Sequence, residues 1–313
     1  MEYRSFSDLS TAINNNITKI PHDVDLIVGI PRSGLMAGNL MALHLNVPIV
    51  DLDGYLENTR INAVNAISTR NTLRCPKDAH HVLLVDDTIY AGKSMIHAEN
   101  LIRKESVDQR ISTCTVYANP RTASLVDIYF ELLESPGCQE WNVMHRDKLE
   151  HFCVDIDGVL CKDPLKQDDD DGPAYLNYLN EATPLMLPSK KAGYLVTGRL
   201  EKYREQTESW LRKYNIQYKE LHMLDLPDAN TRWRLRAAAK FKARVYKSYP
   251  HSQLFIESDP HEAEEIAILS GKQVLCFSNQ KLITPGFSTA RFKSKVRNYR
   301  VWAVKKAKRL AKL

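Results

Sequence analysis

The sequence predicts an α/β protein with two doubly wound domains, and three observations point to this fold class. Short apolar runs alternate with helix-like patterns between residues 24 and 117. A second series of the same kind starts at residue 152. The stretch Ser135-Pro136-Gly137 breaks the pattern between the two series.

The pattern of the first half predicts a parallel sheet with helical crossovers. This order is typical of a sheet whose ligands bind at the carboxyl ends of its strands. We expect strands at 24–30, 48–51, 81–85 and 111–117, and helices at 35–45 and 94–104.

The second half repeats the alternation, with strands expected at 152–154, near 194–196, at 254–256 and at 273–277. One face of a helix is marked by residues at helical spacing, namely Leu200, Tyr203, Thr207, Trp210, Leu211 and Tyr214. We therefore expect one domain at 1–148, a second at 149–286, and a C-terminal tail at 287–313.

The composition is that of a soluble globular protein, with 43% hydrophobic and 26% charged residues. No apolar run approaches the roughly 20 residues that span a bilayer. The six cysteines include no CxxC pair, which favours reduced thiols and a cytoplasmic location. The net charge of +5 conceals an acidic body, because residues 291–313 hold ten basic side chains and no acidic one. Nucleic-acid enzymes usually spread basic charge over a working face, so we do not expect nucleic acid as a partner.

A phosphate-binding pattern follows the third expected strand of the first half. That strand ends in two acids, and a loop of small residues then opens a helix. Such a loop turns backbone N–H groups toward an anion, and the helix N-terminus adds positive potential. The adjacent carboxylates can bind ribose hydroxyls or Mg²⁺. The candidate residues are Asp86, Asp87, Thr88, Tyr90, Ala91, Gly92, Lys93 and Ser94.

A second loop supports the first, because Val28-Gly29-Ile30-Pro31-Arg32-Ser33-Gly34 also follows a strand and opens a helix. The two loops, in this order, resemble the phosphoribosyl pyrophosphate motif and the pyrophosphate loop of type I phosphoribosyltransferases. The resemblance covers about residues 20–125. It implies that Arg32, Ser33 and Gly34 bind the leaving pyrophosphate. It also implies a lid between residues 53 and 77, whose candidate anion contacts are Arg60, Arg70 and Arg74.

Tyr90 departs from the purine-salvage members of that family, in which this loop position is an Asp that handles the base. The departure argues against a nucleobase acceptor. No base-binding hood is recognisable after residue 117.

Two carboxylates stand two residues apart just after the first strand of the second half, in Phe152-Cys-Val-Asp155-Ile-Asp157. Near-strand geometry would aim both toward one phosphate. One can attack phosphorus while the other protonates the leaving alcohol, so a phosphoester is cleaved through an aspartyl-phosphate. The pattern resembles the DxD motif of the haloacid dehalogenase superfamily. This resemblance implies that Asp155 is the nucleophile and Asp157 the general acid and base.

Three further motifs extend this resemblance over about residues 150–280. Thr197, in Val196-Thr197-Gly198-Arg199, would bind the phosphoryl oxygens. Lys242 fits the third motif, with Lys247 as the alternative. Glu257 and Asp259 both fit the acidic fourth motif, whose carboxylates bind Mg²⁺ together with Asp155 and Asp157. The pattern does not choose between Glu257 and Asp259.

The spacing of these motifs leaves little chain for a capping domain. Asp157 and Thr197 are 40 residues apart, and Thr197 and Lys242 are 45 apart. A minimal cap would leave the site open to a large substrate such as a glycan end. The acidic run at 168–171 lacks the spacing of a calcium loop and is interpreted as a solvated loop. Trp141 and Trp233 are interpreted as packing residues.

The two resemblances together predict a bifunctional enzyme. It would transfer 5-phosphoribose from phosphoribosyl pyrophosphate to a glycan hydroxyl and then remove the 5-phosphate. The logic is similar to that of bacterial systems that install ribofuranose in polysaccharides such as lipopolysaccharide O-antigen or capsule. Two alternatives stay open: a nucleobase phosphoribosyltransferase fused to a nucleotidase, and a regulatory module that senses phosphoribosyl pyrophosphate.

The tail predicts a basic amphipathic helix. Its apolar and aromatic residues fall on one stripe at spacings of three and four: Phe292, Val296, Tyr299, Ala303, Ala307 and Leu310. A helix of this kind is suited to an anionic membrane interface. We therefore expect peripheral contact with the inner face of the cytoplasmic membrane, where a lipid-linked glycan acceptor would be found. The alternative is a terminal helix docked on the acidic body.

Overall fold

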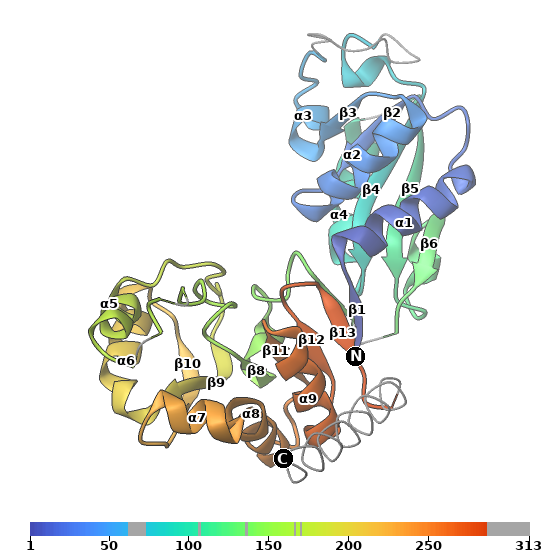
Figure 1. The fold of residues 1–313 in the computed structure, drawn as a ribbon. Coiled ribbons are helices and arrows are strands. Elements are labelled where there is room, and N and C mark those ends of the chain that lie inside the picture. Colours follow the sequence, from blue (N-terminus) through green and yellow to red (C-terminus); the bar gives the residue numbers. More distant parts are fainter. Residues whose placement is uncertain (62–72, 106–107, 135–136, 166, 170, 287–313) are drawn as a thin grey trace, which may run out of the picture. The chain divides into compact units, whose positions relative to one another are not determined.

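The computed structural model describes residues 1–61, 73–105, 108–134, 137–165, 167–169 and 171–286. The chain divides into two compact units, Met1–Trp141 and Asn142–Leu313. Each unit is built on a largely parallel sheet with helices, which confirms the α/β class (Figure 1). The expected tail at 287–313 and Arg70 of the expected lid lie outside the described residues.

The first unit has a five-stranded sheet in the order β3-β2-β4-β5-β6, with every neighbouring pair parallel. A separate two-stranded sheet pairs β1 with β7. The strands are β1 (Glu2–Arg4), β2 (Leu26–Gly29), β3 (Ile49–Asp51), β4 (His81–Ile89), β5 (Arg110–Ala118), β6 (Ile128–Leu132) and β7 (Gly137–Gln139). The helices are α1 (Phe6–Asn16), α2 (Ser33–Leu45), α3 (Leu52–Leu56) and α4 (Lys93–Glu105).

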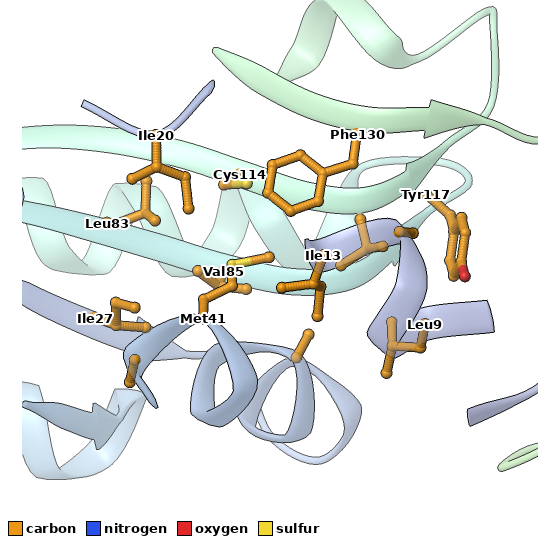
Figure 2. Close-up of a cluster of buried hydrophobic side chains, with 14 of the residues drawn as sticks. Leu9, Ile13, Ile20, Ile27, Met41, Leu83, Val85, Cys114, Tyr117 and Phe130 are labelled. Atoms are coloured by element: carbon orange, nitrogen blue, oxygen red, sulfur yellow. The ribbon is translucent and has the colours of Figure 1, made fainter. Parts of the chain in front are cut away.

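Alternate residues of the central strands enter two separate cores, as period-two side chains require. Ile27 and Leu83 pack with residues of α1 and α2, such as Ile13 and Met41, in the cluster of Figure 2. Their neighbours along the strands pack with residues of α3 and α4 in the second cluster, for example Val82. Helices therefore cover both faces of the sheet, as the sequence pattern predicts.

Several features of the first unit differ from the expectation: β1, β6, β7, α1 and α3 were not predicted, and β4 differs in length. Strand β4 continues four residues past its expected end, because Thr88 and Ile89 still pair with Tyr117 and Ala118 of β5. The acids of the motif therefore lie within the strand. Gly137 belongs to β7, whose pairing with the N-terminal strand β1 was not expected.

The second unit has a six-stranded sheet in the order β10-β9-β8-β11-β12-β13. All neighbouring pairs are parallel except β12 and β13. The strands are β8 (Phe152–Val154), β9 (Ala192–Leu200), β10 (Tyr218–Leu224), β11 (Leu254–Glu257), β12 (Val274–Cys276) and β13 (Lys281–Ile283). The helices are α5 (Pro173–Glu181), α6 (Arg204–Lys213), α7 (Ala229–Leu235), α8 (Ala237–Ser248) and α9 (Pro260–Ser270).

Helices α8 and α9 pack on one face of this sheet, where Tyr246 and Ile266 join Phe255 and Val196 in a buried cluster. Strands β10 and β13 and helices α5, α7 and α9 were not predicted from the sequence. No helix among the described residues has the length and apolar character needed to cross a membrane.

Candidate functional site

The first site lies where β2 and β4 end. These strands are neighbours in a parallel sheet, so the loops after them emerge at the same edge. A Cβ on Gly34 would lie 2.6 Å from the carbonyl oxygen of Val85 and 3.2 Å from Oδ1 of Asp86. Only glycine allows the first turn of α2 to approach the acidic end of β4 so closely. The structure thus brings the two predicted loops together, with Arg32 exposed just before α2.

Asp87 is buried and accepts hydrogen bonds at both carboxylate oxygens. Ser33 Oγ donates to Oδ1 at 2.7 Å, and Trp141 Nε1 donates to Oδ2 at 2.8 Å. Thr88 Oγ1 donates to Oδ2 at 3.2 Å. Trp141 also packs on Phe6, with ring centroids 5.4 Å apart. Trp141 therefore packs against the first core cluster, as the sequence predicted, and its indole also orients an acid of the site.

Asp86 is half-buried, and its Oδ1 accepts a hydrogen bond from the backbone N–H of Asp87 at 2.9 Å. Burial and the neighbouring charge of Asp87 raise the pKa of Asp86 to about 8. A cation placed beside this pair would favour the ionised form of Asp86. The pair is thus suited to bind a metal ion, or to bind ribose hydroxyls.

The residues after β4 form a cavity of about 190 Å³, lined by Asp86, Thr88, Ile89, Tyr90, Ala91, Gly92, Lys93, Ser94 and Met95. Gly92 has φ +75, and a Cβ there would lie 2.6 Å from Leu125 Cδ1, so glycine is required on both grounds. Lys93 and Ser94 are exposed in the first turn of α4. The first N–H groups of a helix lack intrahelical partners, so this cavity is suited to an anion.

A second cavity of about 740 Å³ also has Tyr90 and Ala91 in its wall, with Asn119, Pro120, Arg121, Thr122 and Glu134. Strand β5 is parallel to β4, so the chain after β5 also emerges at this edge of the sheet. There the backbone N–H of Asn119 donates to the carbonyl of Ile89 at 3.0 Å. No base-binding hood was recognisable after residue 117 in the sequence. The described residues therefore offer space for an acceptor beside Tyr90.

The hydroxyl of Tyr90 accepts a hydrogen bond from Gln139 Nε2 at 3.0 Å, and the same amide donates to Thr88 Oγ1 at 3.3 Å. Gln139 lies on β7 and is buried. It orients two members of the predicted motif, although it lies about 50 residues from them and carries no motif of its own.

The second site lies where β8, β9 and β11 end side by side in the sheet. Asp155 follows β8 and is buried. Lys242 Nζ on α8 donates to Asp155 Oδ2 at 2.7 Å, to Glu257 Oε2 at 2.7 Å and to Glu262 Oε2 at 2.8 Å. One ammonium group therefore faces three carboxylates, of which the sequence predicted two.

The pKa values in this cluster reflect burial and an excess of negative charge. Burial and the charge of Glu257 raise the pKa of Asp155 well above its ordinary value. Burial also raises the pKa of Glu257. Burial opposes the charge of Lys242, but the three surrounding carboxylates outweigh it and raise the Lys242 pKa. The cluster would accept a further cation more readily than a further acid.

Asp157 forms a buried ion pair with Arg199. Arg199 Nη2 lies 2.7 Å from Oδ1, Arg199 Nε lies 3.0 Å from Oδ2, and Tyr178 OH donates to Oδ1 at 2.6 Å. Burial opposes the charge of Asp157, but Arg199 and Tyr178 outweigh it and lower its pKa. Asp157 is therefore ionised in this geometry. Arg199 stands inside a predicted motif, yet its spacing alone indicated no partner, and Tyr178 carried no signal at all.

Thr197 is buried in β9, next to the strand that leads to Asp155, and its Oγ1 accepts a hydrogen bond from the Arg199 N–H at 3.2 Å. Lys242, not the alternative Lys247, contacts Asp155, because Lys247 lies exposed on α8.

Glu257 and Asp259 differ in their surroundings. Glu257 is 1% exposed, and its Oε1 accepts backbone N–H bonds from Ser258 and Asp259 at 2.9 and 3.1 Å. Asp259 caps α9, with Oδ1 accepting from the N–H groups of His261 and Glu262, both at 2.8 Å. Glu257 therefore faces the lysine, while Asp259 uses one oxygen to begin a helix.

A cavity of about 520 Å³ opens over Asp155, which lines it. Its wall contains eight carboxylates, namely Asp155, Asp157, Asp163, Asp169, Glu257, Asp259, Glu262 and Glu265. Its lysine and arginine side chains are Arg232, Arg236 and Lys242. Burial and the charges of Asp157 and Asp155 raise the pKa of Asp163 to about 6. Within the described part of the chain, no group of three or more His, Cys, Asp or Glu side chains is arranged to hold a metal ion.

Residues 3–147 match the family model described as "Phosphoribosyl transferase domain". The matched stretch is similar to that family and spans slightly less than half of the chain. The match contains both loops of the first site, so the resemblance drawn from those loops is confirmed at this level. The family match ends at residue 147, before β8 and the second site.

Solved structures similar to the chain include further phosphoribosyltransferases. One is the purine phosphoribosyltransferase from Pyrococcus horikoshii Ot3, at 20% identity and TM-score 0.33, covering 45% of this chain and 93% of that chain. Another is the xanthine-guanine-hypoxanthine phosphoribosyltransferase from Helicobacter pylori, at 14% identity and TM-score 0.36, with coverage of 45% and 93%. The orotate phosphoribosyltransferase from Aeropyrum pernix has 16% identity, TM-score 0.28 and coverage of 41% and 72%. No curated protein matches the sequence.

Proposed function

We propose that the chain transfers 5-phosphoribose from phosphoribosyl pyrophosphate to a glycan hydroxyl and then removes the 5-phosphate to leave ribofuranose. The phosphoribosyltransferase domain supports the first step. One observation carries the second step. Asp155 is a buried aspartate that accepts a hydrogen bond from Lys242, and both residues line a cavity large enough for an organic phosphate. We assign transfer to residues 1–148 and a haloacid dehalogenase-like phosphatase to residues 149–286.

In the transfer step, the acceptor oxygen forms a bond to C1 of the ribose while the bond from C1 to pyrophosphate breaks. The pyrophosphate leaves with the electron pair, and the hydroxyl proton passes to a base. We assign the 5-phosphate to the cavity at Tyr90–Ser94, the ribose and its Mg²⁺ to Asp86 and Asp87, and the pyrophosphate to the loop with Arg32, Ser33 and Gly34. The close approach of the second loop to these acids supports the assignment, since Ser33 Oγ donates to Asp87 and Gly34 lies against Asp86.

The acceptor class is tested by pyrophosphate release. Tyr90, fixed by Gln139 beside the larger cavity, lacks the carboxylate that a purine acceptor would use. We expect release with glycan acceptors and none with adenine, guanine, hypoxanthine or orotate. Pyrophosphate release that depends on a nucleobase would contradict this proposal and indicate a nucleobase salvage enzyme. If phosphoribosyl pyrophosphate stabilises the protein against unfolding but no acceptor causes pyrophosphate release, the domain would be a sensing module.

The two activities are separable if the sites are independent. Replacing Asp86 and Asp87 by Asn should abolish consumption of phosphoribosyl pyrophosphate while leaving phosphate release from added phosphoesters unchanged. Equal loss of both activities would contradict two sites.

In the hydrolytic step, we assign Asp155 as the nucleophile that forms a bond to phosphorus while the bond from phosphorus to the leaving oxygen breaks. Water then attacks the aspartyl-phosphate and frees phosphate. Thr197 and Lys242 would bind the phosphoryl oxygens. Asp157 would protonate the leaving oxygen, which requires that substrate binding weaken its pairing with Arg199, because the paired carboxylate is ionised.

The residues at this site fit Mg²⁺ in their chemistry, since Mg²⁺ prefers oxygen ligands. Oxygens of Asp155 and Glu257 already converge on one cationic atom, Lys242 Nζ. An acid-rich wall also needs a counter-charge before a phosphate dianion can enter. We propose that Asp155 and Glu257 hold Mg²⁺, with Asp157 and Asp259 as further ligands. The ion would polarise the phosphoryl group when bound.

Asp155→Asn tests the nucleophile. We expect the variant to accumulate a product that retains the 5-phosphate. Mass spectrometry would detect it as a product heavier by one phosphate group than the dephosphorylated product. Asp147→Asn is the matched control, because Asp147 is a surface residue of the same unit whose side chain is 89% exposed. Accumulation of dephosphorylated product by Asp155→Asn would rule out this role.

We further propose that residues 287–313 attach the enzyme to anionic lipid, because cations near such a surface contribute about 1 kcal/mol each. Co-sedimentation with anionic vesicles should be lost on removal of these residues and weakened by salt. Equal binding by the truncated chain would end this proposal.

A further inference from the structure

The cavity over Asp155 is larger than a phosphoryl group requires. Its volume of about 520 Å³ is in the range of small-molecule sites, which run from about 300 to 1,000 Å³. The organic part of the phosphoester therefore has room in the same cavity. The residues that would contact it are those of the outer wall, on α7 and at the junction of α7 with α8.

Trp233 lies in that wall. Its side chain lines the cavity and is 53% exposed, although it is a large aromatic group. Exposure of so much aromatic surface inside a cavity is the arrangement expected of a ligand contact. The sequence predicted a packing residue here, and the exposure of Trp233 differs from that expectation.

Trp233 is held at a defined place relative to the phosphoryl end of the cavity. The Arg232 guanidinium lies 5.6 Å from the Trp233 ring centroid. The same guanidinium donates to the carbonyl of Gly198 at 3.1 Å and to Asp169 at 3.3 Å. Gly198 follows Thr197, so one arginine joins the predicted phosphate-binding strand to the indole.

The start of α7 is fixed as well. Asp228 caps the helix by accepting from the Thr231 N–H at 2.6 Å. Asp171 Oδ2 accepts from the Ala229 N–H at 3.0 Å. Asp171, at the end of the acidic run that the sequence predicted to be a solvated loop, therefore anchors this helix, and the wall is a built part of the site.

Arg236 is the cation of this wall that lacks a partner among the described residues, since Lys242 is bonded to three carboxylates and Arg232 to Asp169. It is exposed, and its backbone adopts the left-handed conformation, with φ +46. That conformation costs free energy in a residue with a side chain, and it turns the chain from α7 into α8. In an otherwise acidic wall, Arg236 is available to a phosphate dianion.

We propose that Trp233 and Arg236 form the subsite for the sugar that carries the phosphate. The proposal rests on the phosphatase function proposed above for Asp155. Trp233 would contact the C–H face of the ring, Arg236 would pair with the phosphomonoester charge, and the carboxylates of Asp163, Asp169 and Glu265 would accept hydrogen bonds from ring hydroxyls. Sugar phosphates, rather than phosphates without a ring, are then the preferred substrates.

The test compares phosphate release from ribose 5-phosphate and from acetyl phosphate, which has no ring. Trp233→Ala should lower kcat/KM for ribose 5-phosphate about tenfold through KM, because an aromatic contact of about 1.4 kcal/mol is a factor of ten. It should leave acetyl phosphate unchanged, and Trp233→Phe should restore most of the loss. Arg236→Gln should raise KM for both substrates. Leu235→Ala and Arg234→Gln are the controls, since both residues are exposed on α7 and neither lines the cavity.

The outcomes separate the subsite from the function on which it rests. Equal effects of Trp233→Ala on both substrates, or effects matched by Leu235→Ala, would overturn the sugar subsite while hydrolysis itself stands. With a nucleoside monophosphate as a third substrate, a loss on that substrate that ribose 5-phosphate does not show would assign Trp233 to a base instead of the sugar and overturn the proposal. Hydrolysis that persists in Asp155→Asn, or no hydrolysis by the wild-type chain, would remove the phosphatase function and the subsite with it.

Discussion

Replacement of Arg199 by Met should destabilise the second unit strongly and in a pH-dependent way. The Arg199 side chain is 0% exposed and that of Asp157 is 20% exposed. Removing one partner of a buried ion pair costs about 3–5 kcal/mol, because the other charge stays buried without compensation. The Tyr178 hydroxyl still donates to Asp157 in the variant, so we expect the lower end, about 3 kcal/mol.

The sign of the pH dependence follows from the pKa of Asp157, which Arg199 and Tyr178 lower despite burial. A group with a lowered folded-state pKa stabilises the fold above its unfolded pKa, and this contribution is lost as pH falls through the folded value. Without Arg199, burial dominates and the carboxyl takes up a proton more readily. The loss caused by Arg199→Met should therefore be larger at pH 8 than at pH 5.

Hydrogen exchange of peptides from β8 and β9 reports the free energy of opening in this unit alone. A loss of about 3 kcal/mol corresponds to exchange roughly a hundred times faster. Arg204→Gln is the control, because Arg204 pairs with Glu201 and Glu208 at the surface, where such pairs are worth about 0–1 kcal/mol. The double variant Arg199→Met, Asp157→Asn should recover much of the stability. A single variant no worse than Arg204→Gln, or a double variant no better than the single, would refute this reasoning.

Three further predictions address the other contacts. Gly34→Ala should destabilise the first unit by about 1–3 kcal/mol and weaken binding of phosphoribosyl pyrophosphate, because the new Cβ would lie 2.6 Å from the Val85 carbonyl; unchanged exchange in α2 and β4 would contradict this. The raised pKa of Asp86, about 8, means that its contribution to stability is present at low pH and lost as pH rises through that value. Asp86→Asn should therefore raise the melting temperature more at pH 9 than at pH 5, and an equal shift at both would refute the assignment. Lys242→Met should destabilise the second unit more at pH 8 than at pH 5, because the neighbouring acids with raised pKa values are protonated more fully at low pH; exchange of β11 peptides measures this, and a larger loss at pH 5 would count against it.

The amino-acid sequence by itself determined the α/β class and the position of both sites along the chain. Short apolar runs and helical patterns are local signals, and so are a small-residue loop opening a helix at Gly92 and two carboxylates after a strand at Asp155 and Asp157. These features depend on neighbouring residues, so they are readable without knowing which strands pair. The expected bounds differed from the observed ones where pairing continues, as in β4, which β5 prolongs through Ile89.

The contacts that tune each site were decided by the tertiary structure. Trp141 bonds to Asp87 across 54 positions, Arg199 to Asp157 across 42, and Asp171 to Ala229 across 58. None of these pairs has a spacing that local geometry dictates, because each depends on how segments distant in the sequence pack together. Burial is also a property of the packed chain, and it raises the pKa of Asp155 while the arginine beside Asp157 lowers that of the second acid. Two aspartates that look alike in the sequence therefore become chemically different only once the strands are packed.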